Sequence, residues 1–234
     1  MIRTIAAVAF LGFYVVIVGL PVIAYSLITD TSDFLYRAGK WGIGMSMRLA
    51  GVRVRTEGLE NIPPGVCIFA ANHAGSLDAP ATLIGIPRRI SFLAKKEVFK
   101  VPIVKTALRL AKVVPVDRSD RDAAIASIAE AIQYLNAGIS FVVFPEGTRS
   151  ADGQLMPFKK GTFVMAIQGR VPVVPVSILG SWERMPRGRL KIARGEILLR
   201  FAPAVDSAVY TMERRKDLLE RVQAAVVEGL DSPQ

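Results

Sequence analysis

The single histidine of this chain, His73, is the side chain best suited to proton transfer near neutral pH. It stands in Asn72-His73-Ala74-Gly75-Ser76-Leu77-Asp78, after an apolar run and just before Pro80. The run predicts a buried strand and Asp78 a helix start, so the pair spans a strand-to-helix turn, where open α/β sheets place their sites. A carboxylate across such a turn can hold one ring nitrogen and leave the other as a base. The alternative is a loop histidine beside an N-capping aspartate.

A second polar turn follows another predicted strand. Phe141-Val142-Val143-Phe144 is aromatic and β-branched, and it leads into Pro145-Glu146-Gly147-Thr148-Arg149-Ser150. Proline and glycine favour a turn there, which places a carboxylate, a hydroxyl and a guanidinium at the end of a strand. A guanidinium near backbone N–H groups suits a phosphate monoester. The alternative is a turn that carries a surface ion pair.

Together these segments resemble motifs of the glycerolipid acyltransferase family, and within it the bacterial 1-acylglycerol-3-phosphate acyltransferases. The family's first motif, Asn-His followed by four residues and Asp, stands at 72–78, and its third, Phe-Pro-Glu-Gly-Thr-Arg-Ser, stands unchanged at 144–150. Its second, a short apolar strand ending in arginine, is similar to 113–118. Its fourth, a strand punctuated by prolines, is similar to 171–178. The four motifs follow the family's order.

The resemblance implies that the hydroxyl of lysophosphatidate attacks the thioester of acyl-carrier protein or coenzyme A directly. His73 is then the general base, and Asp78 fixes its tautomer. Arginines and the backbone of the third motif would hold the phosphate, and Glu146 the glycerol backbone or the arginines. Lys105 is a further candidate, or else a solvated helix lysine. The implied substrate-binding residues are Lys105, Arg118, Glu146, Gly147, Thr148 and Arg149.

Two other possible nucleophiles do not suit a covalent mechanism. Cys67 lies inside the apolar run, which is typical of a small buried hydrophobe. Ser76 lacks the Gly-x-Ser-x-Gly surroundings of a nucleophilic serine. No cofactor is expected beyond the acyl thioester, which is a substrate. Two other functions remain open: acyl transfer to glycerol-3-phosphate or a lyso-aminolipid, and a non-catalytic membrane-binding protein.

The composition points to a membrane surface. Thirty basic residues against twenty acidic ones give a net charge of +10, while 51% of the residues are hydrophobic. A basic chain can bind nucleic acid or anionic lipid, and the high apolar share together with the absence of a nucleic-acid-binding motif favours anionic lipid. One cysteine and one histidine argue against a disulfide and against a metal site.

The first fifty residues predict a membrane anchor. No charged residue occurs from Thr4 to Ile28, a length sufficient to cross a bilayer. The run continues past Pro21, which is unlike a cleaved signal peptide. A second stretch, 34–49, has apolar residues at helical spacing and predicts an interfacial amphipathic helix or a helix on the domain's core. The pair would form a hairpin that either spans the bilayer or dips into one leaflet, on the cytoplasmic face of the inner membrane.

Residues 51–234 predict one α/β catalytic domain, a mixed sheet flanked by helices. Strands are expected at 52–55, 66–71, 89–94, 113–116, 141–144 and 171–178, with two more about a glycine turn at 190–199. Helices are expected from 119 to 138 and from 211 to 230. The stripe Ile125, Ile128, Ile132 and Leu135 indicates core packing. The basic cluster from Arg184 to Lys191 predicts a solvated face, or one that meets lipid headgroups or an acidic carrier protein.

Overall fold

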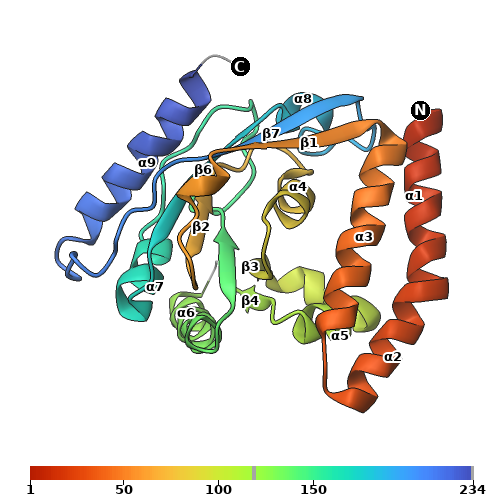
Figure 1. Cartoon of the computed structure of the whole chain (residues 1–234), viewed down its shortest axis with the longest axis horizontal. Coiled ribbons are helices and arrows are strands. Elements are labelled where there is room, and N and C mark those ends of the chain that lie inside the picture. The colour runs from red at the N-terminus through yellow and green to blue at the C-terminus, as the bar shows by residue number, and fades with distance from the viewer. Residues whose placement is uncertain (118–119, 233–234) are drawn as a thin grey trace.

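The sheet is mixed, as expected, and lies between helices (Figure 1). The computed structural model describes residues 1–117 and 120–232, and in that part of the chain seven strands pair in the order β1-β7-β6-β2-β5-β3-β4. Every neighbouring pair is parallel except β6 and β7, which are antiparallel. The strands are β1 (Val52–Glu57), β2 (Ile68–Ala71), β3 (Ile90–Lys95), β4 (Val114–Val116), β5 (Ser140–Val143), β6 (Val173–Leu179) and β7 (Gly195–Phe201).

Helices cover both faces of this sheet, so its central strands are apolar on both sides. In β2, Ile68 and Ala70 pack into one buried cluster with α6, α7 and α9, while Phe69 and Ala71 pack into another with α3 and α4. The helices are α1 (Ile2–Tyr14), α2 (Leu20–Thr29), α3 (Asp33–Ala50), α4 (Asp78–Gly85), α5 (Pro102–Leu110), α6 (Arg121–Asn136), α7 (Gly161–Gly169), α8 (Ser181–Arg184) and α9 (Arg215–Asp231).

The N-terminal residues form the expected helical hairpin. A π-helical turn, Val15–Gly19, joins α1 to α2, and the resulting helix Ile2–Thr29 is the one described segment long and apolar enough to cross a membrane. Its chain reverses at Asp30, and α1 then packs along α3 (Figure 1). The contact is close at Gly42, where an added Cβ would lie 2.4 Å from the ring of Tyr14.

α3 belongs to the core of the α/β fold. Its Met47 and Ala50 are buried in the same cluster as Val52 and Phe69. Of the two structures expected for this stretch, α3 is therefore the helix on the core, although its Trp41 remains exposed. Residue 50, the expected domain boundary, lies inside a continuous apolar core.

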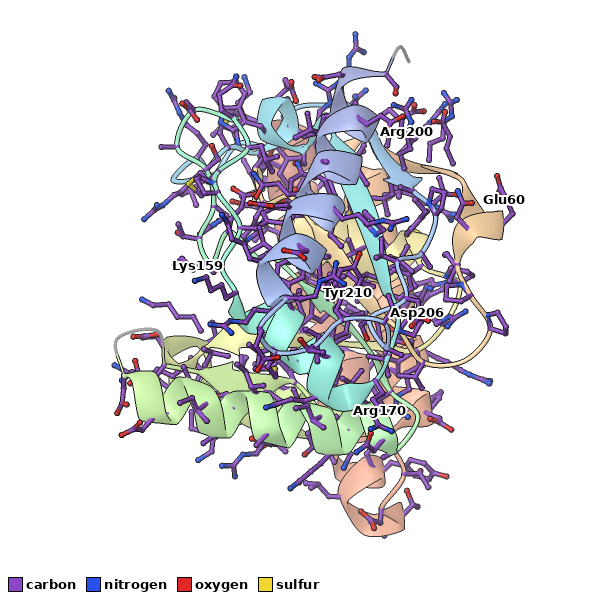
Figure 2. The ribbon with its side chains drawn as sticks, turned by 90° about the vertical axis from the view of Figure 1, so that its left-hand side faces the viewer. Glu60, Lys159, Arg170, Arg200, Asp206 and Tyr210 are labelled. Carbon is purple, nitrogen blue, oxygen red and sulfur yellow. The ribbon has the colours of Figure 1, made fainter. Side chains whose placement is uncertain are left out.

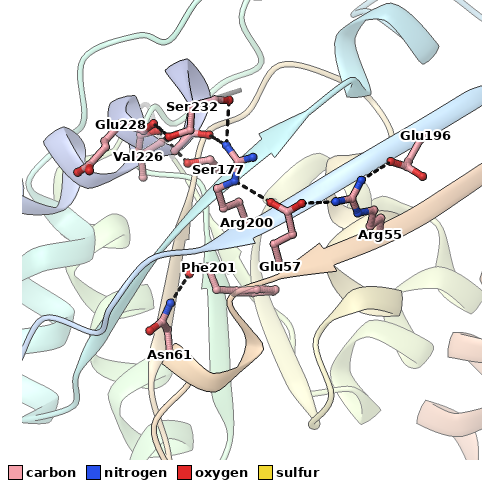
Figure 3. A network of polar contacts seen from close by, with 11 residues as sticks. Arg55, Glu57, Asn61, Ser177, Glu196, Arg200, Phe201, Val226, Glu228 and Ser232 are labelled. Atoms are coloured by element: carbon pink, nitrogen blue, oxygen red, sulfur yellow. Dashed lines mark hydrogen bonds and ion pairs between the residues drawn. The ribbon is translucent and has the colours of Figure 1, made fainter. Parts of the chain in front are cut away.

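The last helix, α9, packs over the sheet on the side opposite to α1. Figure 2 views the molecule from this side, with Tyr210 near the start of α9 and Arg200 near its C-terminal end. A polar network joins that end to the edge of the sheet (Figure 3). Arg200 of β7 pairs with Glu57 of β1 at 2.9 Å and donates to the carbonyl of Gly229 in α9 at 2.6 Å. These contacts, with the hydrogen bond from the hydroxyl of Ser177 to the carbonyl of Val226 at 2.8 Å, hold the C-terminal end of α9 against β6 and β7.

Two sequence expectations were wrong. Residues 190–194 form no strand, because their main-chain N–H groups donate to partners outside the sheet. The N–H of Ile192 donates to the hydroxyl of Thr4 in α1, and the N–H of Ala193 donates to the carbonyl of Arg184. Only β7, from Gly195, pairs in the sheet. Ile125 lies outside the core stripe of α6, since 55% of it is exposed. The boundary of the last helix also differs, because α9 begins four residues later than expected.

Candidate active site

The polar motifs meet at the carboxyl ends of the central strands. The loop 72–77 leaves the end of β2 and enters α4. Its first residue, Asn72, is buried, donates to the carbonyl of Ile178 at 3.0 Å and accepts from the N–H of Ile178 at 2.7 Å. The Asn72 amide therefore continues the pairing of β2 with β6 beyond the last strand residue and orients the loop.

His73 and Asp78 form the pair that their spacing predicts. Nδ1 of His73 lies 2.7 Å from Oδ2 of Asp78, which also accepts from the N–H of Gly75 at 2.9 Å. Asp78 is fully buried at the first turn of α4, where the helix dipole favours a negative charge. A carboxylate at Nδ1 keeps the proton on that nitrogen, so Nε2 is left free to act as a base.

The second polar turn holds both main-chain groups of His73. The His73 N–H donates to Oε1 of Glu146 at 2.6 Å, and its carbonyl accepts from the N–H of Ser150 at 2.8 Å. The imidazole also stacks on Phe144, with 4.0 Å between ring centroids and 16° between the planes. Backbone, ring plane and tautomer are therefore all fixed, which limits the rearrangement needed during proton transfer.

Glu146 has a different position from the one the resemblance implied. It is only 3% exposed, and its other oxygen, Oε2, accepts from the N–H of Met156 at 3.2 Å. Both oxygens thus bind main-chain donors inside the protein, and no ion pair joins Glu146 to an arginine among the described residues. It is a positioning residue that acts through His73. Burial raises the pKa of Glu146 to about 7, and the nearby charge of Asp78 adds to this effect.

The raised pKa of Glu146 predicts a pH-dependent stability. Its folded pKa, about 7, exceeds its ordinary value, 4.5, so the folded state binds the extra proton between these two values. The stability from this group is complete below pH 4.5 and is lost as the pH rises through 7. Glu146→Gln mimics the protonated acid, so we expect the free energy of unfolding of the variant to change less between about pH 5 and about pH 8 than that of the wild type. Denaturant titrations in detergent measure both, and equal slopes would contradict the assignment.

A cavity of about 530 Å³ opens at His73, whose side chain is 18% exposed. One part of its wall is polar and includes Arg149, which donates to the hydroxyl of Ser76 at 2.5 Å. Apolar side chains of β3, α5 and the second motif also line the cavity, and they suit an acyl chain. The polar lining is His73, Ser76, Lys95, Thr148, Arg149 and Arg187, and the apolar lining is Ala79, Phe92, Leu93, Ala94, Leu108, Val113 and Phe144.

The other expected substrate-binding residues do not all lie at the cavity. Thr148 lines the cavity. Gly147 takes a φ of +77° to make the turn, and its N–H donates to the carbonyl of Phe144, so that N–H is not free for a phosphate. Lys105 is exposed on α5, outside the cavity lining. Arg118 lies outside the described residues.

Sequence reasoning assigned Arg187 only to a basic cluster, yet it lines the cavity with His73 and Arg149. Long-range main-chain pairing brings Arg187 to the cavity. The N–H of Ser76 donates to the carbonyl of Met185 at 2.8 Å, and Gly75 and Pro186 form an isolated antiparallel β-bridge. No local spacing contains that signal. Arg187 adds a second guanidinium at the mouth of the site.

Cys67 shows the expected properties of a buried hydrophobe. It is fully buried, and burial raises the pKa of its thiol to about 11, so the thiolate is disfavoured at neutral pH. Among the described residues, no group of three or more His, Cys, Asp or Glu side chains is placed to hold a metal ion.

The site thus combines a His/Asp pair on a strand-to-helix turn with arginines and apolar side chains around one cavity. The Acyltransferase family model matches residues 53–179, more than half of the chain, and the chain belongs to this family. It is similar to the 1-acyl-sn-glycerol-3-phosphate acyltransferase of Limnanthes alba, with 31% identity over 192 residues, 82% of this chain and 68% of that protein. The human 1-acyl-sn-glycerol-3-phosphate acyltransferase alpha is 30% identical over 181 residues, 76% of this chain and 64% of the human protein.

The similarity extends to a solved structure. The crystal structure of the 1-acyl-sn-glycerophosphate (LPA) acyltransferase PlsC from Thermotoga maritima matches with a TM-score of 0.78 and 30% sequence identity. The match covers 100% of this chain and 98% of that chain, so it includes the N-terminal hairpin as well as the sheet. Relatives from plants, human and Thermotoga maritima establish the family, but not a bacterial source for this chain.

Proposed function

We propose that this protein transfers a fatty acyl chain from a thioester to the sn-2 hydroxyl of lysophosphatidate and so makes phosphatidate. The observation that carries the proposal is the position of His73, which is held by Asp78 and open to a cavity lined by Arg149 and by apolar side chains. The names of its relatives support the same acceptor. Acyl-carrier protein and coenzyme A both remain candidate donors.

The reaction follows from the arrangement of His73. Nε2 accepts the proton of the substrate hydroxyl while the oxygen attacks the thioester carbonyl, and the buried Asp78 carboxylate stabilises the imidazolium that forms. Collapse of the tetrahedral intermediate breaks the C–S bond, and the thiolate takes the proton from Nε2. One ester forms, one thioester is cleaved, and the histidine returns to its starting state. Cys67 is buried and Ser76 accepts a hydrogen bond from Arg149, which supports direct attack.

We place the phosphate of the acceptor at Arg149. Its guanidinium is held beside the catalytic loop by Ser76, and Thr148 and Arg187 line the same cavity. A guanidinium binds a phosphate through charge-assisted, often bidentate hydrogen bonds. This wall favours lysophosphatidate or glycerol-3-phosphate over a lyso-aminolipid whose free headgroup lacks a terminal phosphate.

We further propose that α1 and α2 anchor the enzyme on the cytoplasmic face of the inner membrane, among anionic lipids. The helix Ile2–Thr29 is long, apolar and largely exposed, which supports burial in a bilayer. The chain as a whole is basic, and each Lys or Arg near an anionic surface contributes about 1 kcal/mol.

The acceptor is tested by product analysis. Purified protein is incubated with each donor and with lysophosphatidate, glycerol-3-phosphate or a lyso-aminolipid, and products are identified by mass spectrometry. We expect phosphatidate from lysophosphatidate. Turnover with another acceptor only would reassign the substrate, and vesicle binding with no turnover for any combination would favour the non-catalytic membrane-binding alternative.

Arg149→Ala tests the phosphate site. The substitution removes a contact worth about 1.5 to 3 kcal/mol, so the KM for lysophosphatidate should rise about tenfold or more. The KM for the donor should change little. Arg221→Ala is the matched control, because Arg221 is exposed on α9 and is not among the residues that line the cavity. A rise in the donor KM alone would show that Arg149 faces the carrier or the coenzyme A phosphates.

A further inference from the structure

The loop between α8 and β7 has an unusual surface. This segment, Met185–Arg194, is called the interface loop below. Its Leu190 is 86% exposed, the highest value among the large hydrophobic side chains that the structure describes as exposed. Basic residues stand on both sides of Leu190 in the sequence: Arg187, Arg189, Lys191 and Arg194.

Leu190 is not an isolated apolar residue, which alone would need no explanation. An apolar groove of about 540 Å³ lies between the interface loop and α1, and Ile5, Val8, Leu190 and Ile192 are among the residues that line it. Ile5 and Val8 are themselves exposed, as is Ile2 in the preceding turn. Leu190 therefore continues the apolar surface of the helix proposed to enter the bilayer. A continuous exposed apolar surface of this kind marks an interaction site.

The interface loop is fixed at both of its ends. Near one end, the hydroxyl of Thr4 in α1 accepts from the N–H of Ile192 at 3.1 Å. Near the other, the carbonyl of Met185 accepts from the N–H of Ser76 in the catalytic loop at 2.8 Å. Arg187, between these points, lines the active-site cavity. The interface loop thus connects the membrane helix to the catalytic loop through hydrogen bonds.

The charges of the interface loop define the chemistry of its partner. Within residues 1–117 and 120–232, Arg187, Arg189 and Lys191 form no ion pair with an acidic side chain. An anionic partner fits them, and both an anionic bilayer and an acidic carrier protein meet this condition. The continuity of Leu190 with the apolar face of α1 favours the bilayer, because α1 and the loop would then meet one surface.

We propose that the interface loop is a second membrane contact, in which Leu190 enters the bilayer surface and Arg189 and Lys191 bind anionic headgroups. This inference rests on the proposed membrane-bound function and adds a second point at which the protein meets the bilayer. Since the loop is hydrogen-bonded to the catalytic loop, its contact with the bilayer sets the mouth of the active site at the membrane surface. Lysophosphatidate would then reach His73 without leaving the interface.

A fluorescent label at position 190 tests the contact directly. Leu190→Cys in the full-length chain is labelled with an environment-sensitive thiol reagent, and the native Cys67 does not compete because it is buried. The matched control is Val209→Cys, since Val209 is 65% exposed and belongs to the segment between β7 and α9. The helix α9 lies on the side of the sheet opposite to α1 (Figure 1). Vesicles contain phosphatidylcholine with or without phosphatidylglycerol and a lipid-borne quencher.

We expect lipid-borne quenching at position 190 and little at position 209. Adding Arg189→Glu and Lys191→Glu should remove the part of the signal that depends on phosphatidylglycerol. If a water-soluble quencher reaches position 190 equally with and without vesicles, the proposed contact is wrong. Shielding of position 190 by acyl-carrier protein without vesicles, and none by vesicles, would instead assign the surface to the carrier.

Activity separates this inference from the proposed function. Leu190→Asp should lower turnover of lysophosphatidate in bilayers about fivefold or more, while turnover of detergent-dispersed lysophosphatidate stays near the wild-type value. An equal rate on bilayers would overturn the role of Leu190. Wild-type protein that is inactive on both substrates would instead overturn the acyltransferase function, whatever the label at position 190 reports.

Discussion

His73→Ala should lower turnover of lysophosphatidate by about 10²-fold to 10⁴-fold, the usual contribution of a positioned general base. His73 is held at its main-chain N–H and carbonyl, at its ring face and at Nδ1. It is the only histidine of the chain, so no other imidazole can take over the role of Nε2. Rates are measured on detergent-dispersed substrate, which removes membrane binding from the comparison. Retention of more than about a tenth of wild-type turnover would show that His73 is not the base.

Two measurements separate the loss of a base from other effects of His73→Ala. Circular dichroism and vesicle sedimentation should match the wild type, because the ring stacks on Phe144 at the edge of the core. Ser76→Ala should retain far more turnover than His73→Ala, since the proposed attack comes from the substrate hydroxyl. A trapped acyl-enzyme, or equal losses in the two variants, would instead point to a covalent route through Ser76.

The sequence predicts the His73–Asp78 pair well because the contact is local. An apolar strand, a short turn and a helix start leave few ways to arrange two residues in one short motif, and the 2.7 Å contact follows. The two hydrogen bonds that hold the main chain of His73, to Glu146 and from Ser150, are not local. They join two segments far apart in the sequence, and only the pairing of β2 with β5 brings these segments together.

The resemblance at the third motif implied that Glu146 holds the glycerol backbone or the arginines, whereas its described partners are main-chain N–H groups. A carboxylate beside an arginine in a turn indicates a polar surface group, but the turn directs Glu146 inward to main-chain donors and leaves Arg149 at the cavity. The direction of a side chain depends on the detailed turn geometry, here with Gly147 at φ +77°, and composition does not determine it. For the same reason, Arg187 could not be separated from its basic neighbours by sequence alone.

The interface loop shows that an alternating sequence pattern does not by itself establish a strand. Leu190-Lys191-Ile192 alternates apolar and basic residues, which predicts a strand. Its main-chain partners, however, are a threonine hydroxyl of α1 and a carbonyl of α8. Leu190 and Ile192 both line the groove beside α1, so a loop that packs along a helix shows the same alternation as a strand on one face of a sheet.

Asp78→Asn should lower turnover by about 10²-fold to 10⁴-fold, with little change in the KM for lysophosphatidate, which separates it from Arg149→Ala. Oδ2 of Asp78 accepts from both His73 and Gly75, whereas in the described structure Oδ1 has no hydrogen-bond partner. An asparagine whose amide nitrogen replaces Oδ2 would face two donors and would favour the tautomer with its proton on Nε2.

In the other orientation of the substituted amide, its oxygen takes the place of Oδ2. The hydrogen bonds to His73 and Gly75 are then kept, but the charge that stabilises the imidazolium is lost. Both orientations reduce the base function of His73, so the Asp78→Asn variant should be slow in either case. Thermal denaturation in detergent establishes that the protein is folded, and initial rates at saturating donor give the turnover. A folded variant with more than about a tenth of wild-type turnover would mean that the buried carboxylate is not needed to orient or charge-balance His73, and Asp78 would then be a structural residue that supports the N–H of Gly75 at the start of α4.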